Sequence, residues 1–317
     1  MSDPQNQRQR RPRLGADERA RLLAEIAKFD TVPPRPAPAA RSAPISGDRA
    51  EITATEQAAR AALIGDAADM AELPRVVDVW SNLLTIPVDP RTLARNLVIT
   101  ASREDPAHAA FDVLRTRLVQ ALAEHGWRRV GITSPTRDCG KTFTAVNLAI
   151  TLSRYDNCRT VLMDMDLRNP TLARRIGANA PQPMGDFLRG QIPTEAFLRR
   201  LAPNDLNIGG NLAFGLNGRI EPYAAELFQQ QSTTDVLARL QEETEADVML
   251  FDLPPAMAQD DVIAFRPHFD CILMVVGGGI TKASDVRESI RRLGEDKPVI
   301  GIVLNKAEGE GVDDYSY

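Results

Sequence analysis

The segment SPTRDCGKT, residues 134–142, contains the residue types that a phosphate-binding loop needs. Gly140 lets the backbone approach an anion closely, and Lys141 can reach the β- and γ-phosphates of a nucleotide. Thr142 can ligate Mg²⁺ through its hydroxyl group. The alternative is a tight strand-to-helix turn with a surface lysine. The strand and helix predicted on either side of the segment favour the phosphate loop.

Acidic residues follow two apolar segments further along the chain. Asp164 and Asp166 end RTVLMDMD, and Arg168 follows on the same turn. Two carboxylates at this spacing can coordinate Mg²⁺ or accept a proton from an attacking hydroxyl group. Asp252 ends DVMLFD and can hold the shell of a magnesium ion through water. Each carboxylate alone could be an ordinary polar strand end, but together with the loop they predict one site.

The elements that must position these residues alternate between apolar strands and helices. We predict strands at residues 128–133, 159–166, 247–252, 271–276 and 299–305, and helices at 109–122, 141–155, 221–243 and 280–293. This order predicts an α/β fold with a mostly parallel sheet covered by helices on both faces. Ligands of such sheets bind beyond the carboxyl ends of the strands, where the loop, the aspartates and Asn305 are expected.

The regions outside this alternating pattern differ in composition. Residues 1–75 are predicted to be mostly disordered, with one or two short helices and a Pro- and Ala-rich linker. Residues 76–307 form the expected folded domain. Residues 308–317 are expected to be a flexible acidic tail that carries Tyr315 and Tyr317.

Composition limits the class of protein. A net charge of −5 over 317 residues does not suggest a general affinity for nucleic acid or for anionic membranes. The three cysteines have no paired spacing, which indicates free thiols in a reducing compartment. No apolar run approaches the roughly 20 residues that span a bilayer, and the polar N-terminus is unlike a secretory signal. The expected location is the cytoplasm.

Three segments carry a resemblance to a known family. In order and spacing, SPTRDCGKT, VLMDMDLRNP and VMLFDLPP resemble the Walker A, Walker A′ and Walker B segments of the bacterial tyrosine kinases (BY-kinases). These kinases serve capsule and exopolysaccharide synthesis. AAFDVLRTRL resembles the helix before their Walker A strand, and GIVLNK resembles their last core strand. The resemblance covers residues 95–306 and implies a P-loop NTPase fold of the MinD/ParA group.

The resemblance also implies site residues and partners. It implies that Lys141, Asp164 and Asp166 are catalytic. It implies that Mg²⁺ is held by Thr142, Asp164, Asp166 and Asp252, and that ATP is bound by Arg137, Asp138, Cys139, Gly140, Lys141, Thr142, Phe143, Arg168 and Asn305. Tyr315 and Tyr317 would accept phosphate within a ring-shaped homo-oligomer. The implied partner is a separate, membrane-embedded chain-length regulator that holds the cytoplasmic chain at the membrane.

The sequence departs from the family pattern at three places. Arg137 and Asp138 replace the usual Pro-Gly of the loop, although aspartate tolerates a left-handed backbone better than most residues. Leu253 follows Asp252 where threonine is common, and glycines at 277–279 replace a polar side chain. These departures keep a second hypothesis open, a nucleotide-gated assembly factor that transfers no phosphate to protein. A partitioning or division-site ATPase is a third, but its second loop lysine and terminal amphipathic helix are not seen.

Overall fold

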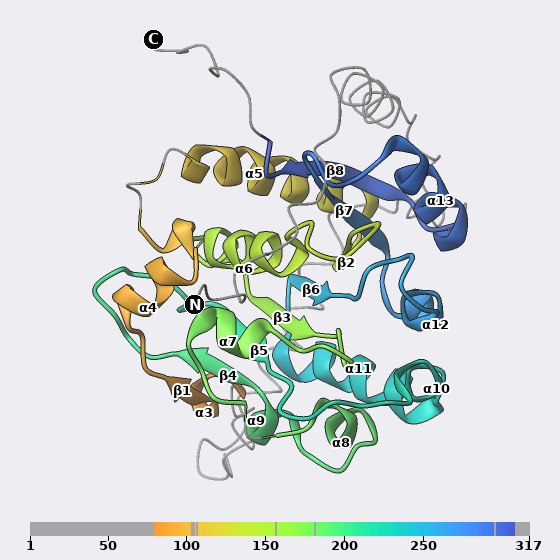
Figure 1. Ribbon diagram of the computed structural model, residues 1–317. Helices are drawn as coiled ribbons and strands as arrows, with labels where there is room; N and C mark the ends of the chain where they lie inside the picture. Colours follow the sequence, from red (N-terminus) through yellow and green to blue (C-terminus); the bar gives the residue numbers. More distant parts are fainter. Residues whose placement is uncertain are drawn as a thin grey trace, which may run out of the picture.

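A computed structural model of the chain describes residues 79–307 apart from 103, 104, 106, 156, 181 and 295. The predictions for residues 1–78 and 308–317, including both tail tyrosines, lie outside the described residues. Within the described part, eight strands form one sheet in the order β1-β4-β5-β3-β6-β2-β7-β8 (Figure 1). Neighbouring strands are parallel except for β4 and β5. The mostly parallel sheet is therefore confirmed.

Strands and helices alternate along the chain. The strands are β1 (Leu84–Ile86), β2 (Arg129–Thr133), β3 (Thr160–Asp164), β4 (Arg199–Leu201), β5 (Leu212–Gly215), β6 (Val248–Asp252), β7 (Cys271–Gly277) and β8 (Val299–Asn305). The helices are α3 (Val79–Asn82), α4 (Pro90–Arg95), η2 (Ile99–Ala101), α5 (Ala107–His125), α6 (Lys141–Leu152), α7 (Leu172–Ile176), α8 (Met184–Leu188), α9 (Thr194–Phe197), α10 (Ala224–Phe228), α11 (Gln231–Thr244), α12 (Asp261–Phe265), η3 (Arg266–His268) and α13 (Ala283–Leu293). None of these helices has both the length and the apolarity to cross a bilayer.

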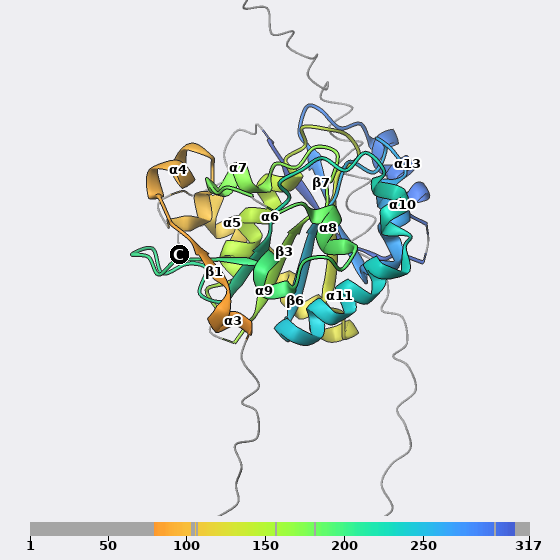
Figure 2. The same cartoon turned by 90° about the horizontal axis from the view of Figure 1, so that it is seen from below.

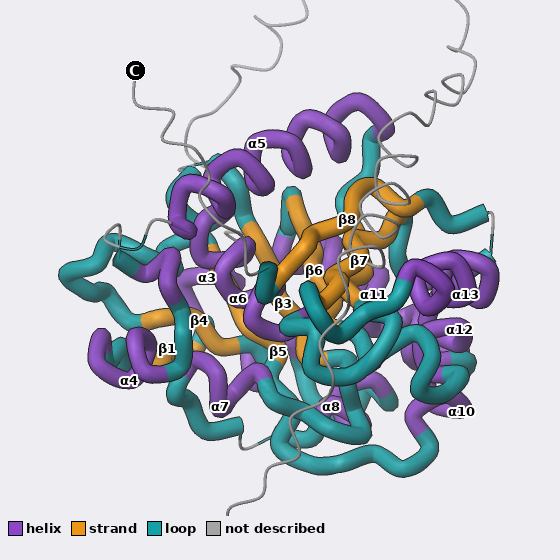
Figure 3. Tube along the Cα trace, turned by 45° about the horizontal axis from the view of Figure 1, so that its top comes forward, coloured by secondary structure: helices purple, strands orange, loops and turns teal. Residues whose placement is uncertain are grey.

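Side chains of the central strands pack into two separate hydrophobic cores, one on each face of the sheet. In β3, Val161 and Met163 pack into one core and Leu162 into the other, because successive side chains of a strand point to opposite faces. Helices α5, α6 and α7 cover one face, and α8, α10, α11, α12 and α13 cover the other (Figures 1 and 2). Figure 3 shows the strands as a layer enclosed by helices. The prediction of helices on both faces is confirmed.

Several element bounds differ from the prediction. The helix predicted at 221–243 is two helices, because Gln230 has an extended backbone (φ −72, ψ 144) and the Thr233 hydroxyl donates to the Leu227 carbonyl at 2.7 Å. The helix predicted at 141–155 ends at Leu152, where the Ser153 hydroxyl donates to the Ile150 carbonyl. Strands β1, β4 and β5 were not predicted, since they are only three or four residues long.

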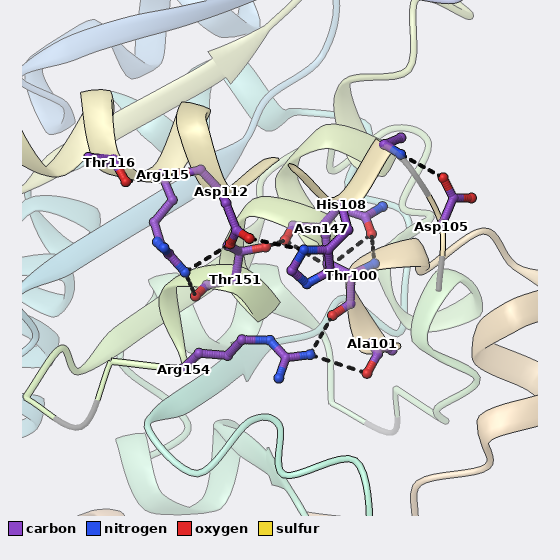
Figure 4. Close-up of polar contacts among 11 residues, drawn as sticks. Thr100, Ala101, Asp105, His108, Asp112, Arg115, Thr116, Asn147, Thr151 and Arg154 are labelled. Atoms are coloured by element: carbon purple, nitrogen blue, oxygen red, sulfur yellow. Dashed lines mark hydrogen bonds and ion pairs between the residues drawn. The ribbon is translucent and has the colours of Figure 1, made fainter. Parts of the chain in front are cut away.

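A buried polar cluster fixes α6 against the segment before α5 (Figure 4). The side-chain oxygen of Asn147 accepts hydrogen bonds from the Thr100 amide and hydroxyl groups, both at 3.0 Å. Its amide nitrogen donates to the carbonyls of Leu97 and Phe143 at 3.0 and 2.9 Å. Arg154 donates to the Thr100 carbonyl at 2.8 Å. Because α6 begins at Lys141, this cluster positions the residues at the start of that helix.

We predict that Asn147→Ala lowers the free energy of unfolding by about 2–4 kcal/mol, since it leaves several buried polar groups unpaired. Urea unfolding of the full chain would measure the change. Thr116→Ala removes an exposed hydroxyl group that bonds within α5, and it should change the free energy by less than about 0.5 kcal/mol. Equal effects of the two substitutions would contradict the assignment.

Candidate active site

The loop between β2 and α6 forms a tight turn although Arg137 and Asp138 replace the Pro-Gly of the family pattern. Asp138 adopts a left-handed backbone with φ 65, as its residue type allows. Gly140 has φ 96, and a Cβ atom there would lie 2.0 Å from Asn305 Nδ2, so glycine is required. Asn305 Nδ2 donates to the Cys139 carbonyl at 2.9 Å, and Lys306 Nζ donates to the Asp138 carbonyl at 2.7 Å. The end of β8 therefore braces the loop.

Two aspartates lie side by side behind the loop. Asp164 of β3 and Asp252 of β6 are register partners on neighbouring parallel strands, and both are completely buried. One oxygen of Asp164 accepts the backbone N–H groups of Thr171 and Leu172 at 3.1 and 3.0 Å. One oxygen of Asp252 accepts the Thr142 hydroxyl at 2.6 Å. The second oxygen of each carboxylate is buried with no hydrogen-bond partner among the described residues.

Lys141 joins the loop to these carboxylates. Its Nζ lies 2.8 Å from Asp166 Oδ2 and 3.6 Å from Asp252 Oδ1. Burial alone would lower the pKa of Lys141, but the charges of Asp252 and Asp166 raise it above its usual value. The lysine is therefore a fixed cation at the first turn of α6.

The buried carboxyl groups are short of positive charge. Burial, followed by the charge of Asp252, raises the pKa of Asp164 well above its usual value. Burial also raises the pKa of Asp252, although Lys141 and the Thr142 hydroxyl oppose this shift. One lysine thus faces more negative charge than it can neutralise, and an added cation would relieve the excess.

A cleft of about 290 Å³ opens over the loop and gathers most of the predicted site residues; we call it the loop cleft. Those that line it are Arg137, Asp138, Gly140, Lys141, Thr142, Phe143, Asp166 and Arg168. Cys139 does not line it, because its side chain is buried and its thiol donates to the Thr136 carbonyl at 3.2 Å. Asp164, Asp252 and Asn305 lie behind the lining.

Sequence reasoning missed other residues of the loop cleft. They are Asn169, Thr171, Arg174, Arg175, Ala258, Gln259 and Asp261, while Pro254 and Pro255 were noted only as a stiff strand exit. Asp261 holds Arg168 through two hydrogen bonds of 2.8 and 3.0 Å. The basic pair Arg174-Arg175 closely follows the aspartates in the sequence and could have indicated further anion-binding residues. Nothing in the sequence marked Asp261 as part of the site.

The site has the partial ligand set that Mg²⁺ uses with a nucleotide. In the part of the chain that the structure describes, no three His, Cys, Asp or Glu side chains converge to hold a metal by themselves. Mg²⁺ commonly takes one or two carboxylates and completes its shell with waters and phosphate oxygens. The Asp164 oxygen without a hydrogen-bond partner among the described residues, and the Asp252 oxygen 3.6 Å from Lys141 Nζ, fit that role beside the Thr142 hydroxyl.

Comparison with known proteins agrees with this geometry. The family model described as the CobQ/CobB/MinD/ParA nucleotide binding domain matches residues 130–315. The putative tyrosine-protein kinase EpsB of Ralstonia nicotianae is 26% identical over 230 residues. The aligned region is 72% of this chain and only 29% of that protein, so the chain spans a minor part of the relative's length.

Solved structures give a matching result for the fold. The kinase domain of the Escherichia coli tyrosine kinase Etk superposes with a TM-score of 0.59 at 24% identity, covering 69% of this chain and 84% of that domain. The VpsO kinase domain has a TM-score of 0.54 at 25% identity, covering 63% and 96%. The chain is thus similar to bacterial tyrosine kinases, as the sequence motifs indicated.

We predict that Asp164→Asn changes how the stability of the nucleotide-free chain depends on pH. A carboxyl group whose folded-state pKa lies above its unfolded value of 3.8 contributes stability below that value. It loses this stability as the pH rises through the folded-state pKa, and asparagine has no such loss. Urea unfolding in EDTA from about pH 4 to 8 should therefore show wild type losing stability relative to Asp164→Asn.

The control for this prediction is Asp205→Asn, an exposed residue between β4 and β5. It should unfold in parallel with wild type across the same pH range. If the difference in the free energy of unfolding between wild type and Asp164→Asn stays constant with pH, the raised pKa of Asp164 is contradicted.

Proposed function

The chain belongs to the CobQ/CobB/MinD/ParA nucleotide-binding family, and from that premise we propose that it is a bacterial protein-tyrosine kinase. It transfers the γ-phosphoryl group of MgATP to a tyrosine hydroxyl group. The observation that carries the proposal is the convergence of Lys141, Asp166 and Asp252 at one end of the sheet. The similarity to proteins named as tyrosine kinases supports it.

Lys141 couples nucleotide binding to the exposure of a base. Without nucleotide, the lysine is paired with Asp166 at 2.8 Å. Nucleotide phosphates offer it stronger, multiply charged partners and draw it toward the loop. The carboxylate of Asp166, which lines the loop cleft, is then released for an incoming hydroxyl group.

Between the two aspartates of the Walker A′ segment, Asp166 is the better placed base. Asp164 is fully buried, and one of its oxygens is held by two backbone N–H groups. Asp166 accepts the tyrosine proton while the tyrosine oxygen bonds to the γ-phosphorus, and the bond from that phosphorus to the β,γ-bridging oxygen breaks. ADP is the leaving group, and Lys141 holds its developing charge.

Thr142, Asp252 and Asp164 would hold magnesium, and Asp166, which the resemblance also implied as a ligand, would serve as the base. Bound Mg²⁺ would supply charge neutralisation on the transferred phosphoryl group. In the chain itself, Asp252 already orients the Thr142 hydroxyl at 2.6 Å, and α6 begins at Lys141, so its N-terminus directly follows the loop. Backbone N–H groups of residues 137–143 then hold the phosphates, with Asn305 bracing the loop from behind.

We propose Tyr315 and Tyr317 of a neighbouring subunit as the acceptors. They follow two aspartates in a segment without large apolar residues other than Val312 and the tyrosines. By its resemblance to the BY-kinases, the chain would act in exopolysaccharide or capsule synthesis as a homo-oligomer. A separate membrane-embedded chain-length regulator would hold it at the membrane from the cytoplasmic side.

We expect Lys141→Met to weaken MgATP binding by about 10- to 100-fold, since it removes a charge-assisted bond to the phosphates. Titration with a fluorescent ATP analogue would measure the affinity. Lys297→Met is the matched control, because that lysine bonds to the Phe269 carbonyl and does not line the loop cleft. Unchanged affinity in Lys141→Met would overturn the site.

The kinase reaction itself is tested by mass spectrometry of the full chain after incubation with MgATP. Phosphate should appear on Tyr315 or Tyr317, and it should be absent in Lys141→Met and in the Tyr315→Phe/Tyr317→Phe double variant. A chain that binds MgATP but gains no phosphate on any tyrosine, alone or with a membrane regulator, would instead be a nucleotide-gated assembly factor. In that case Asp138→Gly, which removes a carboxylate beside the phosphates and gives the residue of the family pattern, would be the first substitution to try.

A further inference from the structure

The lining of the loop cleft carries an excess of positive charge. Its cationic side chains are Arg137, Lys141, Arg168, Arg174 and Arg175, and its carboxylates are Asp138, Asp166 and Asp261. Two of these carboxylates are already paired, Asp166 with Lys141 and Asp261 with Arg168. The remaining lining is cationic except for Asp138.

Arg137 and Arg174 are the exposed part of this excess charge. Both side chains are exposed, and neither has a carboxylate partner among the described residues. Arg175 is less exposed and donates to the Asn96 carbonyl at 2.7 Å. Asn96 in turn donates to the Arg174 carbonyl at 2.8 Å, so the backbone of α7 is fixed while the Arg174 side chain is free to bind.

Arg174 also lies on a particular side of the loop. Strand β2, which leads into the loop, has β6 and then β3 on one side and β7 and then β8 on the other. Helix α7 follows β3, and Figure 1 shows it beside the end of that strand. Asn305 and Lys306, at the end of β8, hold the loop from the opposite side. Arg174 and Asp166, the proposed base, thus follow the same strand, β3, and both line the loop cleft.

The chain itself contains a segment of matching charge. Residues 308–317, EGEGVDDYSY, hold four carboxylates, no basic residue and two of the four tyrosines of the chain. Asp313 and Asp314 directly precede Tyr315. An acidic pair next to the acceptor would bring opposite charges together when the tyrosine hydroxyl reaches Asp166.

We propose that Arg174, with Arg137, selects the acceptor by binding the acidic residues before it, and that segment 308–317 of a second copy enters the loop cleft beside the bound nucleotide. This inference rests on the proposed kinase function and adds the class of substrate, a tyrosine preceded by aspartates. Within one copy, the segment comes soon after Lys306, whose side chain bonds to the Asp138 carbonyl of the phosphate loop. Strands β8 and β3 lie on opposite sides of β2, and Arg174 follows β3, so the tail of a second copy is the occupant that we commit to.

The test uses two full-length chains. The donor carries Tyr315→Phe and Tyr317→Phe, and the acceptor carries Lys141→Met, so phosphate can pass only from donor to acceptor. Intact-mass measurement of the initial rate at several acceptor concentrations gives KM and kcat for the acceptor. Adding Asp313→Asn and Asp314→Asn to the acceptor should raise KM by about five- to tenfold and leave kcat nearly unchanged, as expected for two exposed ion pairs.

Charge reversal separates a binding role from a structural one. Arg174→Glu in the donor should raise the acceptor KM at least as much, without changing the KM for ATP. An acceptor with Asp313→Lys and Asp314→Lys should restore part of the rate with that donor and not with the unchanged one. Arg239→Glu on α11, away from the loop cleft, is the control and should change neither KM.

Failure of the inference is distinguishable from failure of the kinase proposal. Equal KM values for the acidic and neutral acceptors would overturn the inference and leave the kinase proposal standing. Phosphorylation of wild type at a rate independent of its concentration would overturn the second copy as occupant. If no phosphate transfers at all, the kinase proposal fails, and a binding measurement still decides the inference.

That binding measurement uses a fluorescein-labelled peptide of residues 308–317 and a full chain with Asp313→Asn and Asp314→Asn, so that its own tail does not compete. Fluorescence anisotropy should show the acidic peptide binding about five- to tenfold tighter than its Asp→Asn counterpart. The preference should disappear in Arg174→Glu. Equal affinities for the two peptides would overturn the inference whether or not the chain is a kinase.

Discussion

The site depends on two buried aspartates held in register on neighbouring parallel strands. Asp164 and Asp252 meet because β3 and β6 run in the same direction, so their carboxyl ends reach the same edge of the sheet. Two carboxyl groups this deeply buried are ionised only with a cation beside them, since burial otherwise raises their pKa. Lys141 supplies that cation from the first turn of α6. The hydrogen bonds of Asn147 hold α6 in place, and they therefore help to keep Lys141 beside the two aspartates.

The last strand connects the loop to the segment that follows it. Asn305 and Lys306 hold the carbonyls of Cys139 and Asp138, so β8 shapes the phosphate loop from behind. The next residues of the chain begin the acidic segment 308–317. Any change in the loop on nucleotide binding would reach the start of that segment through these two hydrogen bonds. The direct contacts with the loop are thus made by the two residues Asn305 and Lys306, shortly before that segment.

The sequence was sufficient to predict the central part of the fold and much of the lining of the loop cleft. Apolar strands such as β6 and β8 have a clear pattern, and their polar ends, Asp252 and Asn305, marked the site edge. Strands of three or four residues, such as β1, carry too little periodicity to recognise. The pairing of Arg168 with Asp261 joins residues 93 positions apart, so it depends on tertiary packing that no local pattern contains.

The three departures from the kinase pattern fall on the support of the loop, and the charged groups are retained. Leu253 is fully buried, and its side chain packs against Gly131, where a Cβ atom would lie only 2.8 Å away. A Cβ atom at Gly277 would lie 3.3 Å from Cys139 Cα, so this glycine lets the loop backbone pack closely on β7. The Asp138 backbone is left-handed, and its carbonyl is held by Lys306. The substitutions thus form a consistent packing arrangement around Lys141, Asp166 and Asp252, and only the Asp138 carboxylate adds a charge that phosphates would oppose.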